Sequence, residues 1–336
     1  MSLFATGDPP PAATWPPPAP LVPAFGGLPS GTRDVLPDEM RELRAITESL
    51  RGSLARAGYG EVYTPALEYE STLARADVGE AKPVYKLWDE AGEMLVLRSD
   101  MTVPIARLVA TRYREAEGPV RLSYLAHAYR GVRPQRGQPR EFLQAGVELV
   151  GAPSPDGTIE ALTVLCGALD AVGLEGYRVG MGDAALFGAL LDEAGVAEEA
   201  RPPLLHELLT RDFVGLAREA RALGPEVEAL VEVPQRRGGE EVLDGLGAAA
   251  DGLRAVLAAL GEGVRRRVIL DLGLVRRLNY YTGAVWEVYD PALGVPLGGG
   301  GRYDDLLGCF GRPMPAVGWA LTVERLHLAL AGEEQR

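Results

Sequence analysis

Two arginines stand at the ends of predicted elements, where their side chains could bind an anion. Arg130 closes the strand pattern RLSYLAHAYRGV (121–132), and Arg325 opens the last helix of the chain. A guanidinium group presents a planar fork of N–H donors that fits a phosphate or a carboxylate. Taken singly, such arginines more often form surface ion pairs, so the assignment of these two depends on the residues around them.

A second set of polar residues lies on or next to predicted strands. Gln144 and Glu148 are four residues apart in REFLQAGVELVGA (140–152), so alternation places both side chains on one face of that strand. Asp100 and Thr102 follow the strand pattern MLVLRSD (94–100). A carboxylate and a hydroxyl suit an ammonium group, Glu148 suits an N–H donor, and Gln144 can both donate and accept. Each of these residues alone is more often a solvated or core residue.

The elements that must hold these residues follow from hydrophobic periodicity. Helices are predicted at 38–57, 101–115, 157–172 and 322–331, and the stretch GEVYTPALEYE (60–70) is predicted to be a strand closed by Pro65. The strands 121–132 and 140–152 read as an antiparallel hairpin. Further strands are expected at 177–183, 268–274, 284–290 and 316–321. Helices segregated around antiparallel strands predict an α+β fold.

Four segments are expected along the chain. Residues 1–25 are crowded with Pro and Ala and predict a disordered or polyproline tail. The core is predicted in two parts, 26–183 and 264–332, separated by a helical insertion at 184–263 that is rich in Ala, Leu and Glu. The four glycines Gly298–Gly301 lack the form of a phosphate-binding loop and predict a turn at a strand edge.

Composition excludes several classes of protein. No apolar run approaches the roughly 20 residues of a membrane-spanning helix, and no secretory signal opens the chain, so a cytoplasmic location is expected. The net charge of −13 makes nucleic-acid binding a poor prediction. Cys166 and Cys309 are expected to be packing residues, and His127, His206 and His327 lack metal-ligand spacing, so neither a metal site nor a cofactor is predicted.

Three separated segments resemble the signature motifs of class II aminoacyl-tRNA synthetases. They are the helix 38–57 with YTPALEYE, then AYRGVRPQRGQPREFLQAGVELVG (128–151), and GGGGRYDDLLGCFGRPMPAVGWALTVERL (298–326). A fourth segment, LVRRLNYYTGAVWEVY (274–289), is similar to the histidine-recognition segment of the histidyl enzymes. The resemblance covers about residues 26 to 332, and it implies an antiparallel sheet flanked by helices.

The resemblance also implies a histidine pocket. Its residues would be Asp100, Thr102, Gln144, Glu148, Arg276, Tyr280 and Tyr281. Glu148 would accept the imidazole N–H, Arg276 would bind the carboxylate of the amino acid, and strand alternation would let only one of the two tyrosines face the pocket. Arg130 and Arg325 match the arginines that hold ATP phosphates in the synthetases, which makes them candidate nucleotide- or phosphate-binding residues.

Four departures separate the chain from a synthetase. Val132 stands where the second motif normally has Glu, and the histidine segment carries Arg277 and Asn279 where the family has Gly and Asp. The segment LRSDMTVPIAR (97–107) is similar to the regulatory-subunit branch of the family. The chain ends ten residues after Leu326, so no anticodon-binding domain is expected.

These departures imply a non-catalytic regulatory subunit of ATP phosphoribosyltransferase. Such a subunit would pair with a short-form catalytic subunit as a homodimer within a hetero-oligomer such as a hetero-octamer. It would make the first step of histidine biosynthesis responsive to histidine without binding tRNA. Three alternatives stay open. They are a truncated histidyl-tRNA synthetase-like enzyme that activates histidine with ATP, a synthetase-like enzyme that charges another acceptor, and a dimeric scaffold with an inactive pocket.

Overall fold

The computed structural model describes residues 27–76, 84–131, 138–274 and 280–334. Its centre is a nine-stranded sheet in the order β1-β5-β6-β12-β11-β10-β7-β9-β8. The strands of this large sheet are β1 (Gly60–Glu61), β5 (Val120–Tyr129), β6 (Glu141–Val150), β7 (Arg178–Asp183), β8 (Arg237–Gly238), β9 (Val268–Asp271), β10 (Ala284–Tyr289), β11 (Gly298–Arg302) and β12 (Ala316–Thr322). The predicted Pro-rich tail lies outside the described residues.

The sheet is antiparallel through its middle and parallel near its two ends. β5 and β6 form the predicted hairpin, with Val120 opposite Val150 and Tyr129 opposite Glu141. Antiparallel pairing continues through β12, β11, β10 and β7. Parallel pairing joins β1 to β5 and β7 to β9. The predicted α+β architecture is therefore confirmed, with a mixed sheet in place of a fully antiparallel one.

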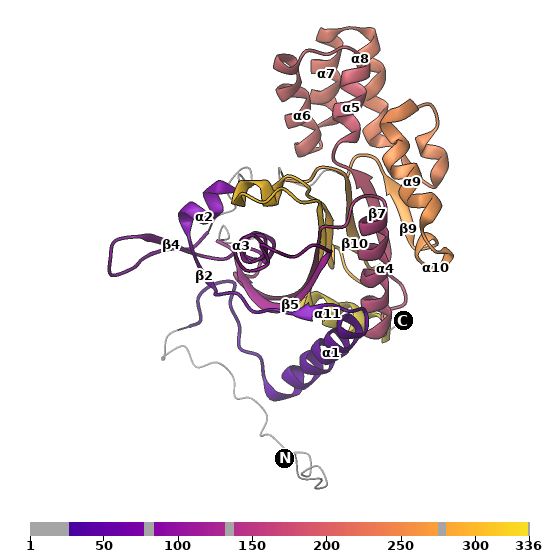
Figure 1. The fold of residues 1–336 in the computed structure, drawn as a ribbon. Coiled ribbons are helices and arrows are strands. Elements are labelled where there is room, and N and C mark those ends of the chain that lie inside the picture. Colours follow the sequence, from indigo (N-terminus) through magenta and orange to yellow (C-terminus); the bar gives the residue numbers. More distant parts are fainter. Residues whose placement is uncertain (1–26, 77–83, 132–137, 275–279, 335–336) are drawn as a thin grey trace.

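Helices cover both faces of this sheet. One face packs on α1 (Pro37–Arg56), α4 (Asp156–Ala171) and α11 (Val323–Glu334), where Leu50, Leu162 and Leu326 join the main apolar core. The other face curves around α3 (Thr102–Arg112), which Figure 1 shows end-on inside the curve. No helix among the described ranges is long and apolar enough to cross a membrane.

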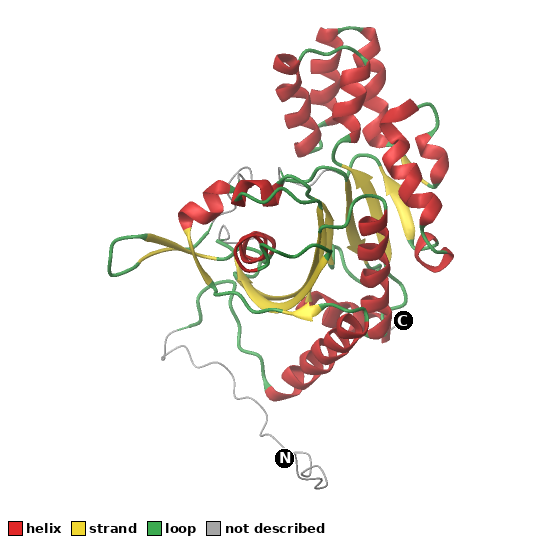
Figure 2. Ribbon diagram, viewed as in Figure 1, coloured by secondary structure: helices red, strands yellow, loops and turns green. Residues whose placement is uncertain are grey.

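A small second sheet projects from the core beside α3. It has the order β2-β4-β3, with β2 (Leu67–Tyr69), β3 (Lys86–Trp88) and β4 (Met94–Leu97), and α2 (Glu70–Arg75) follows β2. Figure 2 shows it as a ribbon of strands extending away from the body. The strand predicted within 60–70 is confirmed only in part, because Gly60–Glu61 pair with β5 and Leu67–Tyr69 pair with β4, so the stretch holds two short strands in different sheets.

The chain between β7 and β9 is mostly helical, as Figure 2 shows. It contains α5 (Leu186–Glu193), α6 (Arg201–Thr210), α7 (Phe213–Leu223), α8 (Pro225–Ala229), α9 (Asp251–Ala259) and α10 (Glu262–Arg265), together with short 3₁₀ turns and β8. Helices α5 to α8 share a separate apolar cluster that includes Leu191, Leu204 and Leu216. Asp212 caps α7 by accepting hydrogen bonds from the backbone N–H groups of Val214 and Gly215.

Candidate functional site

Glu148 is the centre of a buried hydrogen-bond network on the face of the sheet that surrounds α3. Its side chain comes from the middle of β6 and is 1% exposed. Thr102, the first residue of α3, donates its hydroxyl to Glu148 Oε1 at 2.8 Å. Tyr303, just after β11, donates its hydroxyl to Glu148 Oε2. Two of the predicted residues, Thr102 and Glu148, are thus in direct contact.

The carboxyl group of Glu148 is held in an environment that favours its protonated form. Burial raises its pKa to about 8, and the negative charge of Asp100 acts in the same direction. The hydrogen bonds from Tyr303 and Thr102 favour the ionised form and oppose this rise. Burial therefore makes the ionised form of Glu148 costly, and a ligand with a positive charge or an N–H donor would offset that cost by stabilising the ionised form.

Glycines on the neighbouring strands leave room for the Glu148 side chain on this face of the sheet. Glu148 pairs across the sheet with Gly318, and Gly318 pairs with Gly301, so one row of the sheet carries two residues without side chains. A Cβ atom on Gly318 would lie 2.5 Å from the carbonyl oxygen of Val147 and would also overlap the Glu148 carboxylate. Gly298–Gly301 therefore belong to a central strand, β11, and the predicted strand-edge turn is wrong.

Two tyrosines from the chain ahead of β10 close one side of this space. The rings of Tyr280 and Tyr303 meet edge to face with centroids 5.7 Å apart, and the rings of Tyr280 and Tyr281 are 4.9 Å apart. A Cβ atom on Gly301 would lie 2.8 Å from the Tyr281 ring. Both tyrosines precede β10, so the alternation of a strand does not govern them, and the expectation that only one of the two faces the site stays a prediction.

Gln144 lies on the same strand face, farther along β6. It is 6% exposed, and its Oε1 atom is buried without a hydrogen-bond partner among the described residues. A buried amide oxygen without a donor is costly, so this atom is suited to accept a hydrogen bond from a ligand. Asp100 lies in the loop before α3, where Ser99 Oγ donates to its Oδ2 at 3.4 Å. Arg276 lies outside the described residues, together with Val132, Arg277 and Asn279.

The two predicted anion-binding arginines lie at one end of the sheet. Tyr129 pairs with Glu141 and Thr322 pairs with Gln144, so β5 and β12 both end there, immediately before Arg130 and shortly before Arg325. Arg130 lies over the ring of Phe142, 4.7 Å from its centroid, and its Nε is 3.4 Å from the carbonyl oxygen of Ser99. Arg325 donates to the carbonyl oxygen of Pro296 at 2.5 Å, and burial lowers its pKa.

Sequence reasoning missed Tyr303, although it shares the GGGGRYDD segment with the glycines that line the site. The signal was available, because Gly301 and Tyr303 are two residues apart and strand alternation places them on the same face. The histidines, by contrast, form no metal site: no cluster of three or more His, Cys, Asp or Glu residues suited to a metal occurs within the described ranges.

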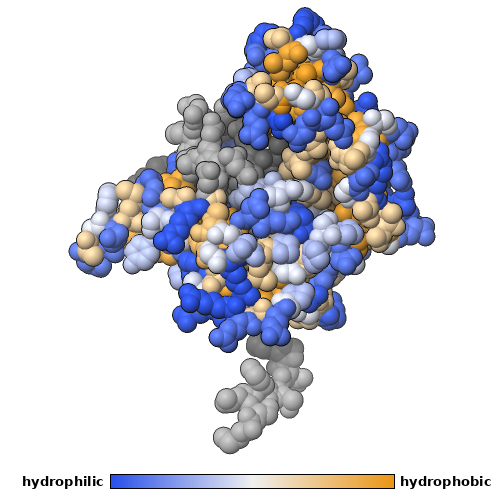
Figure 3. All heavy atoms as spheres, turned by 45° about the horizontal axis from the view of Figure 1, so that its top comes forward, coloured by the Kyte–Doolittle hydropathy of each residue, from blue (hydrophilic) through white to orange (hydrophobic). Residues whose placement is uncertain are grey.

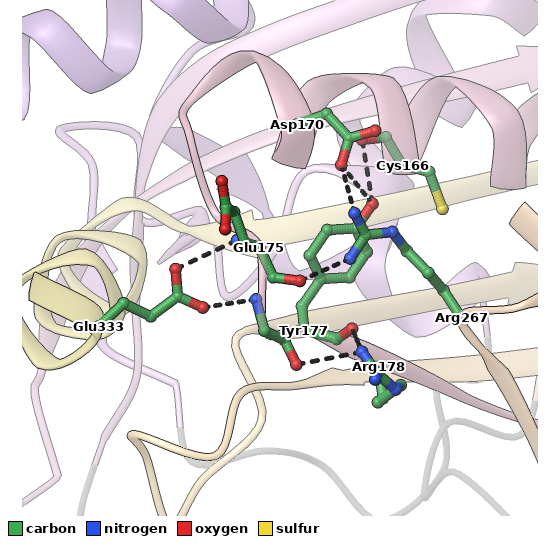
Figure 4. Close-up of polar contacts among 8 residues, drawn as sticks. Cys166, Asp170, Glu175, Tyr177, Arg178, Arg267 and Glu333 are labelled. Carbon is green, nitrogen blue, oxygen red and sulfur yellow. Dashed lines mark hydrogen bonds and ion pairs between the residues drawn. The ribbon is translucent and has the colours of Figure 1, made fainter. Parts of the chain in front are cut away.

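A second polar cluster lies on the far side of α4, where β7 begins (Figure 4). The Arg267 guanidinium lies over the Tyr177 ring at 4.0 Å and contacts Asp170 at 3.1 Å. Tyr177 also donates to Asp170 at 2.9 Å. A shallow pocket of about 610 Å³ adjoins this cluster. Since these side chains bind one another, the cluster is best explained as a structural contact that holds the start of β9 against α4.

The two cysteines have different surroundings. Cys166, at the edge of that second cluster, is buried, and burial raises the pKa of its thiol, which disfavours the reactive thiolate. The predicted packing role of Cys166 is confirmed. Cys309 is exposed on a 3₁₀ turn (Leu306–Phe310), so the same prediction is wrong for that residue.

Comparisons with known proteins agree on one family. The family model for histidyl-tRNA synthetase matches residues 31–326. An ATP phosphoribosyltransferase regulatory subunit from Desulforamulus reducens is 41% identical over 319 residues, covering 91% of this chain and 79% of that protein. A protein of the same name from Moorella thermoacetica is 42% identical over 316 residues, covering 90% of this chain and 81% of that protein.

A solved structure gives the same result. The crystal structure of an ATP phosphoribosyltransferase regulatory subunit/histidyl-tRNA synthetase from Bacillus halodurans C superposes with a TM-score of 0.82 at 33% identity. The match covers 91% of this chain and 83% of that chain.

Proposed function

Because the chain belongs to the family of ATP phosphoribosyltransferase regulatory subunits, which is related to histidyl-tRNA synthetases, we propose that it senses histidine for a short-form catalytic subunit. In this proposal the chain carries no chemistry of its own and binds no tRNA. It supports its partner's activity in the cytoplasm and lowers that activity when histidine occupies the site around Glu148.

One observation carries the proposal, namely the buried network of Thr102, Glu148 and Tyr303. Each oxygen of Glu148 accepts one hydrogen bond from the protein, and a carboxylate has further lone pairs for an imidazole N–H. The unpartnered Oε1 of Gln144 lies on the same strand face and can accept a second donor. Asp100 supplies a negative charge for the α-ammonium group. These groups suit the imidazole and the α-ammonium group of histidine.

Homodimer formation is part of the proposal, with the segment 38–70 at the two-fold interface. Within and next to this segment, large apolar side chains are exposed: Val35, Leu36, Met40, Tyr63, Leu67 and Tyr69. Figure 3 shows hydrophobic residues among polar ones on the projecting small sheet. A two-fold interface brings the same patch together from both copies and can cover such residues. A monomeric mass in light scattering would contradict this part.

The positions of Arg130 and Arg325 support a second candidate, an enzyme that activates histidine with ATP. Both arginines follow strands that finish at the same end of the sheet. Among the described residues, the Arg325 side chain donates one hydrogen bond, to a carbonyl group, which leaves other N–H donors for phosphate. Histidine-dependent exchange of pyrophosphate into ATP by the pure chain would favour this candidate over the regulatory subunit.

The decisive experiment mixes the chain with a short-form catalytic subunit and measures phosphoribosyl-ATP formation over a range of histidine concentrations. Glu148→Ala removes a charged hydrogen-bond partner, which costs about 1.5–3 kcal/mol. We therefore expect it to raise the histidine concentration needed for inhibition by roughly ten- to a hundredfold.

Glu160→Ala is the matched control, because Glu160 binds Arg121 on the opposite face of the sheet. It should keep the wild-type inhibition curve. Loss of turnover with unchanged inhibition in Glu148→Ala would instead place histidine control elsewhere. A thermal melt of each variant separates these results from misfolding.

A further inference from the structure

A partly buried ion pair connects α3 to the small projecting sheet. Glu68, the middle residue of β2, is 6% exposed and receives two hydrogen bonds from Arg107, at 2.9 Å from Nε and 2.6 Å from Nη2. Two parallel N–H···O bonds fix both the distance and the orientation of their partners. The strand β2 and the helix α3 are therefore held in one relative position.

Arg107 and Thr102 lie on different sides of α3. They are five residues apart, which places them about 140° apart around the helix axis. Arg107 points to β2, whereas Thr102 donates to Glu148 on β6. The helix thus spans the space between the small sheet and the buried network, with one polar contact at each side.

A second buried arginine holds the loop that leads into α3. Arg98 is 3% exposed and donates to the carbonyl oxygens of Thr64 at 2.6 Å, Pro65 at 3.2 Å and His127 at 2.8 Å. It ties the chain just before Asp100 to both β5 and the segment ahead of β2. The start of α3 is thereby fixed from two directions.

From these contacts we infer that the Glu68–Arg107 ion pair sets the position of Thr102 against Glu148. Glu68 and Arg107 are then positioning residues for the histidine site, although neither lines it; this inference rests on the proposed function. Leu67 and Tyr69, the two neighbours of Glu68, are 44% and 52% exposed on the opposite face of β2. The pair therefore also connects the site to the exposed face of β2, which a second copy would cover in the proposed homodimer.

The chain offers a matched control pair on the other face of the sheet. Arg121 on β5 binds Glu160 on α4 through two hydrogen bonds of 2.7 Å. Its geometry is similar, but it joins the sheet to a helix that does not contact Glu148. Glu68→Gln and Glu160→Gln each remove one negative charge from a carboxylate that accepts two hydrogen bonds from an arginine.

Two measurements on the full chain test the inference. In the ligand-free protein, hydrogen exchange of the backbone amides within 101–106, all but Pro104, reports local opening at the start of α3, and titration calorimetry reports histidine affinity. Glu68→Gln should speed exchange at 101–106 and weaken histidine binding by about three- to tenfold. Glu160→Gln should change neither, and Glu68→Ala should exceed Glu68→Gln in both.

The outcomes distinguish the inference from the proposed function. Unchanged exchange at 101–106 in both Glu68 variants, with thermal melts showing folded protein, would overturn the inference. Faster exchange in a chain that binds no histidine, even as wild type, would uphold the positioning role and overturn the proposed function. Equal effects of Glu68→Gln and Glu160→Gln would show general loosening and would also overturn the inference.

Discussion

The two faces of the nine-stranded sheet use the same strands for different purposes. On the face toward α1, α4 and α11, β6 and β12 present Val147, Leu149 and Trp319, which pack in the main core. On the face toward α3, the intervening residues of the same strands are Gln144, Gly146, Glu148 and Gly318. The period of two lets one strand be apolar toward α1, α4 and α11 and carry polar side chains and glycines toward α3.

This difference indicates that one face of the sheet mainly supports folding stability and the other mainly supports ligand binding. The helical face fills its volume with large side chains, whereas the α3 face keeps glycines and a buried carboxyl group that costs free energy in its ionised form. Substitutions on the helical face should change the free energy of unfolding, and those on the α3 face should mainly change binding.

The largest expected effect is on the helical face. Trp319 is 2% exposed and donates its indole N–H to the carbonyl oxygen of Ala161 at 3.0 Å. Trp319→Ala should lower the free energy of unfolding by about 3–5 kcal/mol, because it leaves a cavity and removes the indole hydrogen bond to α4. Denaturant unfolding measures this. The control Trp88→Ala, at a side chain that is largely exposed, should change it by less than about 0.5 kcal/mol.

The next effect concerns the charge on the α3 face. Because the pKa of Glu148 is raised to about 8 in the folded protein, the folded state binds a proton that the unfolded state has released at neutral pH. Wild-type stability should therefore fall, relative to Glu148→Gln, as the pH rises from about 5 to about 8, by at most about 1.4 kcal/mol per pH unit.

Thermal unfolding of wild type and Glu148→Gln, measured side by side across this pH range, reports the effect. Near pH 5 the protonated carboxyl group and the amide are alike, so the two curves should converge there. Curves that stay parallel from pH 5 to pH 8 would contradict a raised pKa of Glu148.

The smallest of the three effects on stability concerns the glycines. Gly318→Ala should lower the free energy of unfolding by about 1–3 kcal/mol, because the new methyl group meets the backbone of Val147 and displaces the Glu148 carboxylate. Histidine binding should be lost with it, as titration calorimetry would show. Gly167→Ala in α4, where a Cβ atom meets nothing within 4 Å, should instead be neutral or slightly stabilising.

Much of the fold could be predicted because the strongest patterns are local. The helix α1, the hairpin β5–β6, and α4 have clear periodicity, and the structure places their ends within one to three residues of the predicted bounds. The prediction of a turn at Gly298–Gly301 was wrong because glycines favour turns in isolation. Here they form a central strand beside the bulky Trp319. That neighbour lies across the sheet, where a local pattern has no information.

The site was predictable in part for the same reason. Gln144 and Glu148 share one strand, so alternation alone places them together. The hydrogen bond from Tyr303 to Glu148 joins residues that are 155 positions apart, and the Glu68–Arg107 pair depends on the packing of β2 on α3. Such contacts are set by tertiary packing, which spacing in the sequence does not reveal.

The parallel pairing of β7 with β9 limits how the chain could be shortened. Val179 lies opposite Val268, so the chain leaves β7 at Asp183 and must return to the other end of that strand before β9 begins. A tight turn cannot make this crossover, since parallel strands need a connection of about a dozen or more residues. A deletion of the helices α5–α10 would therefore require a linker of that length, and removing β8 with them would leave the outer edge of β9 unpaired and open to association with another chain.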